Sequence, residues 1–265
     1  MTDYQVTASV TALRASPSED APMDSQLLHG EVFSVEKEEN GWVYGTARRD
    51  DYSGWVSLSA LEEPVLISTH RVSALRTYAF SEPDLKSRPR AIVSLNAKVA
   101  SAQRKGKFID CQRLGWIFET HLAVLGAAES DYVAVAERFL YTPYLWGGRE
   151  SIGLDCSGLV QTALEAAGVR GFPRDTKEQE AWAKTRWNTL DISDDLAGLQ
   201  RGDLIFWPGH VGIMTDSRSL LHANAHHMAT VVEPLATAAK RIAHKSSPIS
   251  AICRPPVETG WTGMM

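Results

Sequence analysis

The stretch GLDCSGLVQTALEAAG, Gly153–Gly168, predicts a helix that begins at a cysteine. Its apolar residues recur at helical spacing and form one face: Leu159, Val160, Ala163, Leu164 and Ala167. Asp155 is a residue type that caps helix starts, and Gly168 is a type that ends helices. Cys156 therefore falls in the first turn, where unpaired N–H groups and the helix dipole favour a thiolate. The same N–H groups can hold a developing oxyanion.

A packed, inert thiol is the alternative to a nucleophile at Cys156, and the helix alone does not decide between them. A catalytic thiolate needs a base. His210 starts the strand-like run HVGIM, and His222 lies in the run SLLHAN, twelve residues later. Two neighbouring strands can place these imidazoles side by side, so that His222 orients and polarises His210. Cys156, His210 and His222 therefore form a candidate catalytic triad.

A zinc site is a second interpretation of the same residue types. Cys156, His210, His222, His226 and His227 offer sulfur and nitrogen ligands. None of their spacings matches a standard zinc motif such as C-x-x-C or H-E-x-x-H. We therefore expect no metal and no other cofactor.

Composition limits the class of protein. The chain has 265 residues, which suggests two or three domains at about 100–200 residues each. It is 44% hydrophobic and 22% charged, enough for a packed core. The net charge is −5 without a basic block, which argues against nucleic acid as a partner.

Cysteine content and hydropathy suggest where the protein works. Three cysteines, Cys111, Cys156 and Cys253, make a poor disulfide framework and fit a reducing compartment. The N-terminal residues show no secretory signal pattern. No apolar run approaches the ~18 residues that a membrane helix needs, so we expect no membrane partner. These features predict a cytoplasmic protein.

An internal repeat organises the N-terminal half. VTALR at Val10–Arg14 matches VSALR at Val72–Arg76, and GWVSLSAL at Gly54–Leu61 matches GWIFETHL at Gly115–Leu122. The two offsets, 62 and 61 residues, indicate a duplicated module of about 60 residues. In the first copy, Asn40-Gly41 separates two alternating runs and predicts a hairpin. Each copy therefore predicts a small β-barrel, although the second copy lacks the middle Gly-Trp.

The sequence changes character near Ala127. A helical pattern precedes Pro143, the cysteine helix follows, and four strand-like runs come next: DLIFW, HVGIM, SLLHA and TVVEPL. Helices followed by a run of strands predict an α+β domain. The expected domains are therefore residues 1–64, 65–126 and 127–265.

The motifs YLWGGRESIGLDCSGLVQ, GFPRDTKEQ, RGDLIFWPGHVGIM and LLHAN together resemble the NlpC family of papain-like cell-wall cysteine peptidases. The resemblance runs in order through residues 132–255. The duplicated module resembles bacterial SH3-like domains, which precede the peptidase in three-domain members of this family. The resemblance implies a papain-like cysteine peptidase domain, of α+β class, preceded by two small SH3-like β-barrels.

The resemblance assigns the reacting groups. Cys156 matches the nucleophile, His210 the general base and His222 the orienting polar residue. Asp155 and Ser157 flank the nucleophile and match positions that line the D-Glu and amine side of the substrate.

Further positions match residues that contact substrate in the family. Tyr144 and Trp146 match aromatic positions beside the cysteine, and the tyrosine is a candidate to hold the oxyanion or the substrate. Asp175 matches a position that meets the substrate, where other members carry serine. Tyr52 matches the tyrosine of the first SH3-like domain that reads the free N-terminus, and Glu31 matches the acidic partner of the substrate ammonium.

The activity implied by the resemblance is cleavage of the γ-D-glutamyl–L-diamino acid bond in murein peptides with a free N-terminal L-Ala. An ammonium-binding site of this kind rejects blocked chains, which favours recycling of released peptides over attack on intact wall. Alternatives are an exported wall-remodelling hydrolase and an inert wall-binding protein. Acyl or amide transfer on lipids is a third, and no apolar anchor segment supports it. The diamino acid, the preferred peptide length, the role of the second SH3-like copy and the oligomeric state stay open.

Overall fold

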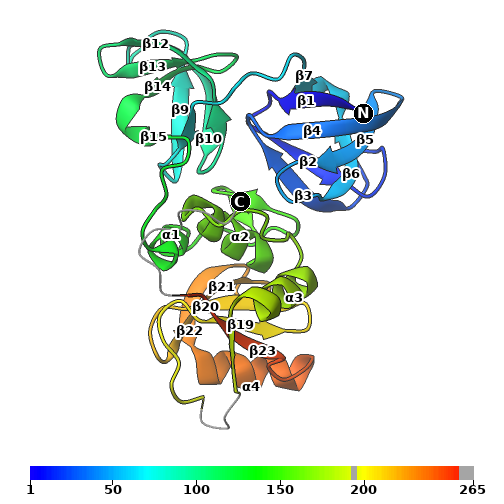
Figure 1. Cartoon of the computed structure of the whole chain (residues 1–265), viewed down its shortest axis with the longest axis vertical. Helices are drawn as coiled ribbons and strands as arrows, with labels where there is room; N and C mark the ends of the chain where they lie inside the picture. Colours follow the sequence, from blue (N-terminus) through cyan, green and yellow to red (C-terminus); the bar gives the residue numbers. More distant parts are fainter. Residues whose placement is uncertain (192–195, 257–265) are drawn as a thin grey trace. The chain divides into compact units, whose positions relative to one another are not determined.

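The computed structural model describes residues 1–191 and 196–256, which fold into two compact units (Figure 1). The first unit comprises Met1–Ala127 together with the short segment Arg149–Ser151. The second comprises Ala128–Gly148 and the described residues from Ile152 onward. The first unit is built from strands, whereas the second combines helices with a sheet (Figure 1).

The first repeat folds into a seven-stranded sheet with the order β3-β2-β6-β5-β4-β1-β7. Its strands are β1 (Thr2–Val6), β2 (Val10–Arg14), β3 (Met23–Leu28), β4 (Val32–Glu39), β5 (Trp42–Ala47), β6 (Ser53–Ser57) and β7 (Leu61–Glu62). Asn40 and Gly41 connect β4 to β5, both with positive φ, as the predicted two-residue hairpin requires. A buried apolar cluster that includes Leu13, Phe33 and Val56 packs inside this sheet.

The second repeat forms two smaller sheets, ordered β10-β9-β14-β13-β12 and β11-β8-β15. Their strands are β8 (His70–Val72), β9 (Arg76–Phe80), β10 (Pro89–Ser94), β11 (Lys98–Val99), β12 (Ser101–Lys105), β13 (Phe108–Cys111), β14 (Gly115–Phe118) and β15 (Leu122–Val124). Cys111 is fully buried in the apolar cluster of this region. It therefore has the environment of a structural thiol.

The repeated Gly-Trp segments adopt the same local structure in both copies. Each is a strand that leads into a one-turn 3-10 helix, η1 (Leu58–Ala60) in the first copy and η2 (Glu119–His121) in the second. The residues before these turns, Ser57 and Phe118, have nearly identical backbone angles, with φ of −64° and −63°. Whether each copy is a separate SH3-like barrel stays a prediction, because both lie in one compact unit.

The second unit is organised around a six-stranded sheet with the order β18-β23-β19-β20-β21-β22. Its strands are β18 (Asn188–Leu190), β19 (Leu204–Trp207), β20 (His210–Met214), β21 (Ser219–Asn224), β22 (Ala229–Pro234) and β23 (Ala251–Arg254), all antiparallel to their neighbours. Its helices are α1 (Tyr132–Glu137), α2 (Cys156–Ala166), α3 (Thr176–Arg186) and α4 (Leu235–Lys245). Two short strands, β16 (Arg149–Glu150) and β17 (Gly153–Leu154), precede α2.

Helix α2 is the central helix of this unit. The Asp155 carboxylate caps it by accepting the Gly158 N–H at 2.7 Å, as the sequence predicts. Gly168 follows the helix with φ of 93°, a conformation that glycine adopts without strain. The helix packs against β20 and β21, while α4 packs against β21 and β22. Helix α2 therefore contacts the two strands that carry the candidate histidines.

Gly212, which has no side chain, allows β20 and β21 to approach each other closely beside His222. A Cβ atom at this position would lie 2.7 Å from the Leu220 side chain and 3.2 Å from Cβ of His222. Any larger residue would displace the Leu220 side chain and crowd Cβ of His222.

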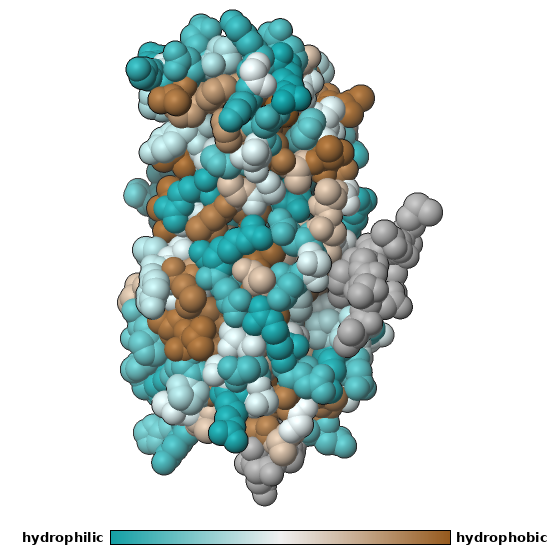
Figure 2. Space-filling view, turned by 90° about the vertical axis from the view of Figure 1, so that its left-hand side faces the viewer, coloured by the Kyte–Doolittle hydropathy of each residue, from teal (hydrophilic) through white to brown (hydrophobic). Residues whose placement is uncertain are grey.

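The described surface is mixed in polarity. Apolar side chains lie in small groups among hydrophilic ones on the face drawn in Figure 2. Among the residues that the structure describes, no helix is long and apolar enough to cross a membrane.

Candidate active site

Cys156 is the first residue of α2 and is almost fully buried, with 6% of its surface exposed. The Val211 amide of β20 and the Thr176 hydroxyl of α3 hydrogen-bond its thiol. Val211 directly follows His210, so this hydrogen bond places the sulfur beside the first residues of β20. Thr176 was not among the residues predicted from the sequence.

The thiol has the opposite pKa shift from the one that the helix position predicts. Burial, together with the nearby Asp155 carboxylate, raises the pKa of Cys156 to about 11. The hydrogen bonds from Val211 and Thr176 and the charge of Arg174 lower it, but they do not outweigh desolvation. The expectation of a resting thiolate is therefore wrong for the free protein, in which Cys156 is a neutral thiol at neutral pH.

His210 and His222 lie side by side, joined by a 2.8 Å contact between Nε2 of His210 and Nδ1 of His222. They come from the adjacent antiparallel strands β20 and β21. Burial lowers the pKa of His210 to about 3, with the charges of His222 and Arg241 acting in the same direction. Burial also lowers the pKa of His222 to about 4, against the raising effect of Glu233. Both imidazoles are therefore neutral at neutral pH.

Two charged residues that the sequence analysis missed extend this pair. Glu233 on β22 lies with Oε1 2.8 Å from Nε2 of His222. Arg241 on α4 donates to the same carboxylate, with Nη1 2.7 Å from Oε2. Burial opposes ionisation of Glu233, but hydrogen bonds from Arg241 and His222 outweigh it and lower its pKa to about 2. A polar chain therefore runs from His210 through His222 and Glu233 to Arg241.

Asp155 is held in a second buried cluster, with Arg174 as its main partner. Nη1 of Arg174 lies 3.0 Å from Oδ1, and Nη2 lies 2.7 Å from Oδ2. The Gly147 N–H donates to Oδ2 at 2.9 Å, and the Ser157 hydroxyl donates to Oδ1 at 3.2 Å. Ser157 in turn accepts from Arg174 at 2.8 Å. The predicted roles of Asp155 and Ser157 toward substrate stay predictions, since these groups already bind one another.

The two aromatic candidates differ in exposure. Tyr144 is half-buried, and burial together with Cys156 and Asp155 raises the pKa of its phenol well above 10. Its hydroxyl therefore stays protonated near the thiol and is able to donate a hydrogen bond. Trp146 is 69% exposed, so its ring is open to solvent rather than part of the core.

Asp175 is exposed and immediately precedes α3, but its carboxylate makes no capping hydrogen bond to that helix. Arg174, one position earlier in the same motif, is buried and binds Asp155. Asp175 was predicted from the sequence, but its neighbour Arg174 is the residue that completes the buried cluster around Asp155. The contact of Asp175 with substrate stays a prediction.

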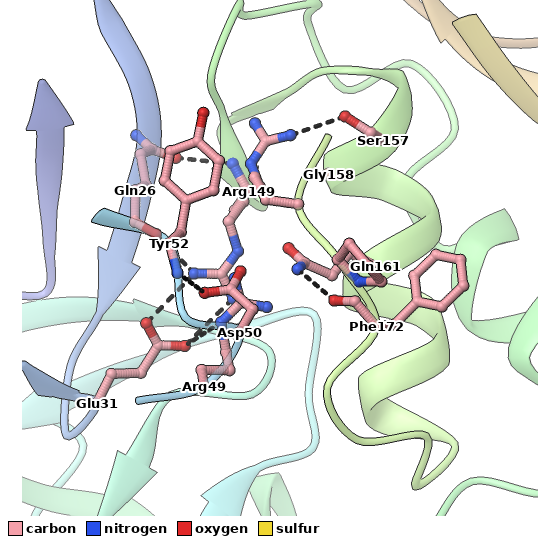
Figure 3. A network of polar contacts seen from close by, with 12 residues as sticks. Gln26, Glu31, Arg49, Asp50, Tyr52, Arg149, Ser157, Gly158, Gln161 and Phe172 are labelled. Carbon is pink, nitrogen blue, oxygen red and sulfur yellow. Dashed lines mark hydrogen bonds and ion pairs between the residues drawn. The ribbon is translucent and has the colours of Figure 1, made fainter. Parts of the chain in front are cut away.

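Glu31 and Tyr52 belong to the first unit. Glu31 is 1% exposed, and both its oxygens face Arg149, each at 3.2 Å from a guanidinium nitrogen (Figure 3). Arg49 adds a contact of 3.3 Å. Burial opposes ionisation of Glu31, but the charges of Arg149 and Arg49 outweigh it and lower its pKa to about 2. In the described structure Glu31 is therefore paired with guanidinium groups, and its contact with a substrate ammonium stays a prediction.

Tyr52 is partly buried against the apolar cluster of the first sheet. Its backbone closes the turn after β5, because the Ala47 N–H donates to the Tyr52 carbonyl at 2.9 Å. This placement gives it a packing role, and its contact with substrate stays a prediction.

Within residues 1–191 and 196–256, no group of three or more His, Cys, Asp or Glu side chains is arranged to hold a metal ion. His226 and His227, part of the zinc interpretation, contact each other edge to face, with ring centroids 4.6 Å apart. A buried thiol and two paired imidazoles are the residue types that nucleophilic catalysis by a cysteine requires, and these roles stay a prediction.

Comparison with known proteins finds two matching domain families. Residues 13–61 match the bacterial dipeptidyl-peptidase SH3 domain, and residues 141–245 match the NlpC/P60 family. Dipeptidyl-peptidase 6 of Lysinibacillus sphaericus is 27% identical over 83% of this chain and 86% of its own length. The gamma-D-glutamyl-L-lysine dipeptidyl-peptidase of Bacillus subtilis strain 168 is 27% identical over 77% of this chain and 73% of its own.

One solved structure covers almost the whole chain. An NlpC/P60 family protein from Bacillus cereus superimposes with a TM-score of 0.79, at 17% identity, over 97% of this chain and all of that protein. At this identity the similarity concerns the fold.

Proposed function

The chain carries an NlpC/P60 peptidase domain preceded by a bacterial dipeptidyl-peptidase SH3 domain, and from this premise we propose a specific activity. The protein is a cysteine peptidase that hydrolyses the γ-D-glutamyl–L-diamino acid bond of murein peptides with a free N-terminal L-Ala. The observation that carries the proposal is the position of the buried Cys156 thiol. The Val211 amide, next to His210, hydrogen-bonds this thiol, and the His210 imidazole is paired with that of His222.

Acylation begins from neutral partners. His210 bonds His222 through Nε2, which leaves Nδ1 as the nitrogen available to the Cys156 thiol. Because the pKa of the thiol is about 11, its proton moves to His210 as the sulfur attacks the γ-carbonyl carbon of D-Glu. His210 then returns this proton to the nitrogen of the diamino acid as the C–N bond breaks. A thioester between Cys156 and the γ-carbonyl remains.

Deacylation reverses the roles. His210 takes a proton from water, whose oxygen adds to the thioester carbonyl. The C–S bond breaks, His210 returns its proton to the sulfur, and the product leaves as the γ-carboxylic acid, which loses its remaining proton to solvent. Each half-reaction returns His210 to its neutral state.

Charge that develops on the carbonyl oxygen needs hydrogen-bond donors. The Gly158 N–H already binds the Asp155 carboxylate, so the relevant first-turn donors are the N–H groups of Cys156 and Ser157 at the start of α2. The Tyr144 hydroxyl stays protonated, because its pKa is raised by burial and by Cys156. We assign these groups to the oxyanion.

The substrate class rests on the relatives. One of them is named a gamma-D-glutamyl-L-lysine dipeptidyl-peptidase, and a dipeptidyl-peptidase releases two residues from a free N-terminus. A site that binds an ammonium discriminates strongly against a blocked chain, because blocking leaves buried polar groups unpaired. Released peptides are then the substrate, which supports a role in murein recycling and a cytoplasmic location.

A panel of synthetic stem peptides tests the proposal. We expect L-Ala-γ-D-Glu-L-Lys or L-Ala-γ-D-Glu-diaminopimelate to be cleaved after D-Glu by the wild-type chain. Cys156→Ala should show no cleavage, while Cys253→Ala, which replaces another buried cysteine in the same unit, should stay active. Mass spectrometry identifies the products.

N-acetylated peptides separate the alternatives. Recycling of free peptides predicts cleavage of the blocked peptide at least about 100-fold slower than the free one. Equal rates would favour a wall-remodelling enzyme. If neither peptide is cleaved, the peptidase proposal fails and a wall-binding role is favoured.

A further inference from the structure

Glu233 is placed to act on His222 by the pairing of β21 with β22. In this register His222 lies opposite Val231, and Leu220 lies opposite Glu233. Residues two apart on a strand share a face, so Glu233 sits diagonally across from His222 on the same face. The contact of 2.8 Å between Oε1 and Nε2 is the result.

Arg241 holds this carboxylate in its ionised form. Its two terminal guanidinium nitrogens bond different oxygens of Glu233, which matches the geometry of a bidentate pair. The Arg241 side chain is 18% exposed and that of Glu233 is 11% exposed, so solvent competes weakly. A carboxylate held this way only accepts hydrogen bonds.

Proton positions along the chain of contacts follow from this constraint. Glu233 accepts, so Nε2 of His222 carries the proton of that contact. Neutral His222 then has an unprotonated Nδ1, which accepts from Nε2 of His210. Neutral His210 with its proton on Nε2 has its lone pair on Nδ1. That lone pair is what the Cys156 thiol requires of a base.

We propose that Glu233, fixed by Arg241, is a positioning residue that sets the tautomers of His222 and His210 and so keeps Nδ1 of His210 unprotonated for Cys156. The assignment rests on the proposed cysteine peptidase function for its catalytic consequence. Its structural content, two imidazoles both protonated at Nε2, can be observed without any substrate.

The charged groups around His210 and His222 shift the pKa values of the two imidazoles in opposite directions. Glu233 favours imidazolium at both positions, whereas Arg241 disfavours it. His227, on the turn after β21, also disfavours imidazolium at His222. On the thiol side, Asp155 disfavours and Arg174 favours the thiolate. Removing the charge of Glu233 or of Arg241 should therefore shift the imidazole pKa in opposite senses.

The first test is the tautomer itself. Nitrogen NMR of histidine-labelled protein, assigned with His210→Gln and His222→Gln, distinguishes protonated from unprotonated ring nitrogens. We expect Nε2 to be protonated and Nδ1 unprotonated in both rings of the wild type. In Glu233→Gln, Arg241 attracts the amide oxygen, so the amide NH2 faces His222 and reverses both tautomers.

The second test is catalysis by the same variants. Glu233→Gln should lower kcat by about 100-fold, because the His210 nitrogen that faces the thiol then carries a proton. Lys240→Gln, one residue before Arg241 on α4 and exposed, is the matched control and should keep wild-type kcat and tautomers. KM should change little in either variant.

The third test separates positioning from a structural role. In the pH profile of kcat/KM, the limb that reports imidazole ionisation should move to lower pH in Glu233→Gln and to higher pH in Arg241→Gln. A role limited to holding β22 and α4 together would lower the melting temperature without these opposed shifts.

The outcomes distinguish this inference from the proposed function. Protonation of Nδ1 in wild-type His222, or unchanged tautomers together with unchanged kcat in Glu233→Gln, would overturn the positioning role even if stem peptides are cleaved. A wild-type chain that cleaves no stem peptide while showing the expected tautomers would refute the peptidase proposal alone.

Discussion

Two carboxylates of the second unit, the buried Asp155 and the partly buried Glu233, are each held by an arginine, yet they have different roles. Asp155, bound by Arg174, also accepts from the backbone of Gly147 and Gly158. Glu233, bound by Arg241, accepts from an imidazole. The partners of Asp155 have fixed protons, so that cluster sets the shape of the loop and helix start. The partner of Glu233 is an imidazole whose proton can lie on either nitrogen, so we expect this chain to set the tautomers of His222 and His210.

Of the variants that test this comparison, the one that removes the base His210 should have the largest effect on activity. His210→Gln keeps a polar side chain of similar size but cannot take the thiol proton. We expect kcat/KM for the free stem peptide to fall by about 10³–10⁴-fold, with a small change in unfolding free energy. Residual activity within about tenfold of wild type would mean that another group acts as the base.

Asp155→Asn should act mainly on stability. The substitution removes the Asp155 charge from the buried Arg174 guanidinium, which costs about 3–5 kcal/mol. Urea denaturation measures the loss. Glu137→Gln, which removes a partner of Arg201 from an ion pair more than a third exposed, is the control and should cost at most about 1 kcal/mol. Equal losses in the two variants would show that the Asp155 cluster is not structural.

The imidazole chain should make the protein less stable in acid. The pKa values of His210 and His222 in the folded protein, about 3 and 4, lie below the ordinary value of 6.5. The unfolded chain therefore binds more protons below pH 6.5, and stability falls as the pH drops from about 6.5 toward 4. Urea midpoints at a series of pH values measure this slope, which His222→Gln should reduce. An unchanged slope in that variant would place the titration elsewhere.

Thr176→Val tests the contribution to kcat/KM that we expect to be the smallest. The hydroxyl bonds the Cys156 sulfur and lowers its pKa, so its loss should raise that pKa further. One hydrogen bond of about 1 kcal/mol corresponds to about a fivefold decrease in kcat/KM. Thr185→Val, on the same helix and exposed, should have no effect. A loss of more than about 100-fold would assign Thr176 a larger role than stabilising the thiol.

The sequence was informative where a residue acts through its own strand or helix. The Asn40-Gly41 hairpin, the Asp155 cap and the four strand runs of the second unit all have local signatures. The pairing of His210 with His222 also followed, because two short strands joined by a short turn become neighbours.

Contacts that depend on register or burial could not be predicted from sequence. Glu233 reaches His222 because of the exact alignment of β21 and β22, and Arg241 reaches Glu233 because α4 folds back on that strand. In the sequence alone, nothing distinguishes Glu233 or Arg241 from an ordinary charged surface residue. The thiolate expectation failed for a related reason, since helix position is visible in the sequence whereas the depth of burial at Cys156 is not.

The most direct test of the central claim is detection of the thioester. Wild-type protein is mixed with L-Ala-γ-D-Glu-diaminopimelate, quenched in acid within milliseconds, and examined by intact-protein and peptide mass spectrometry. We expect an L-Ala-γ-D-glutamyl adduct on Cys156 that forms before product accumulates and is absent in Cys156→Ala. Turnover of the peptide by Cys156→Ala, or an adduct on Cys111 or Cys253 instead, would contradict it.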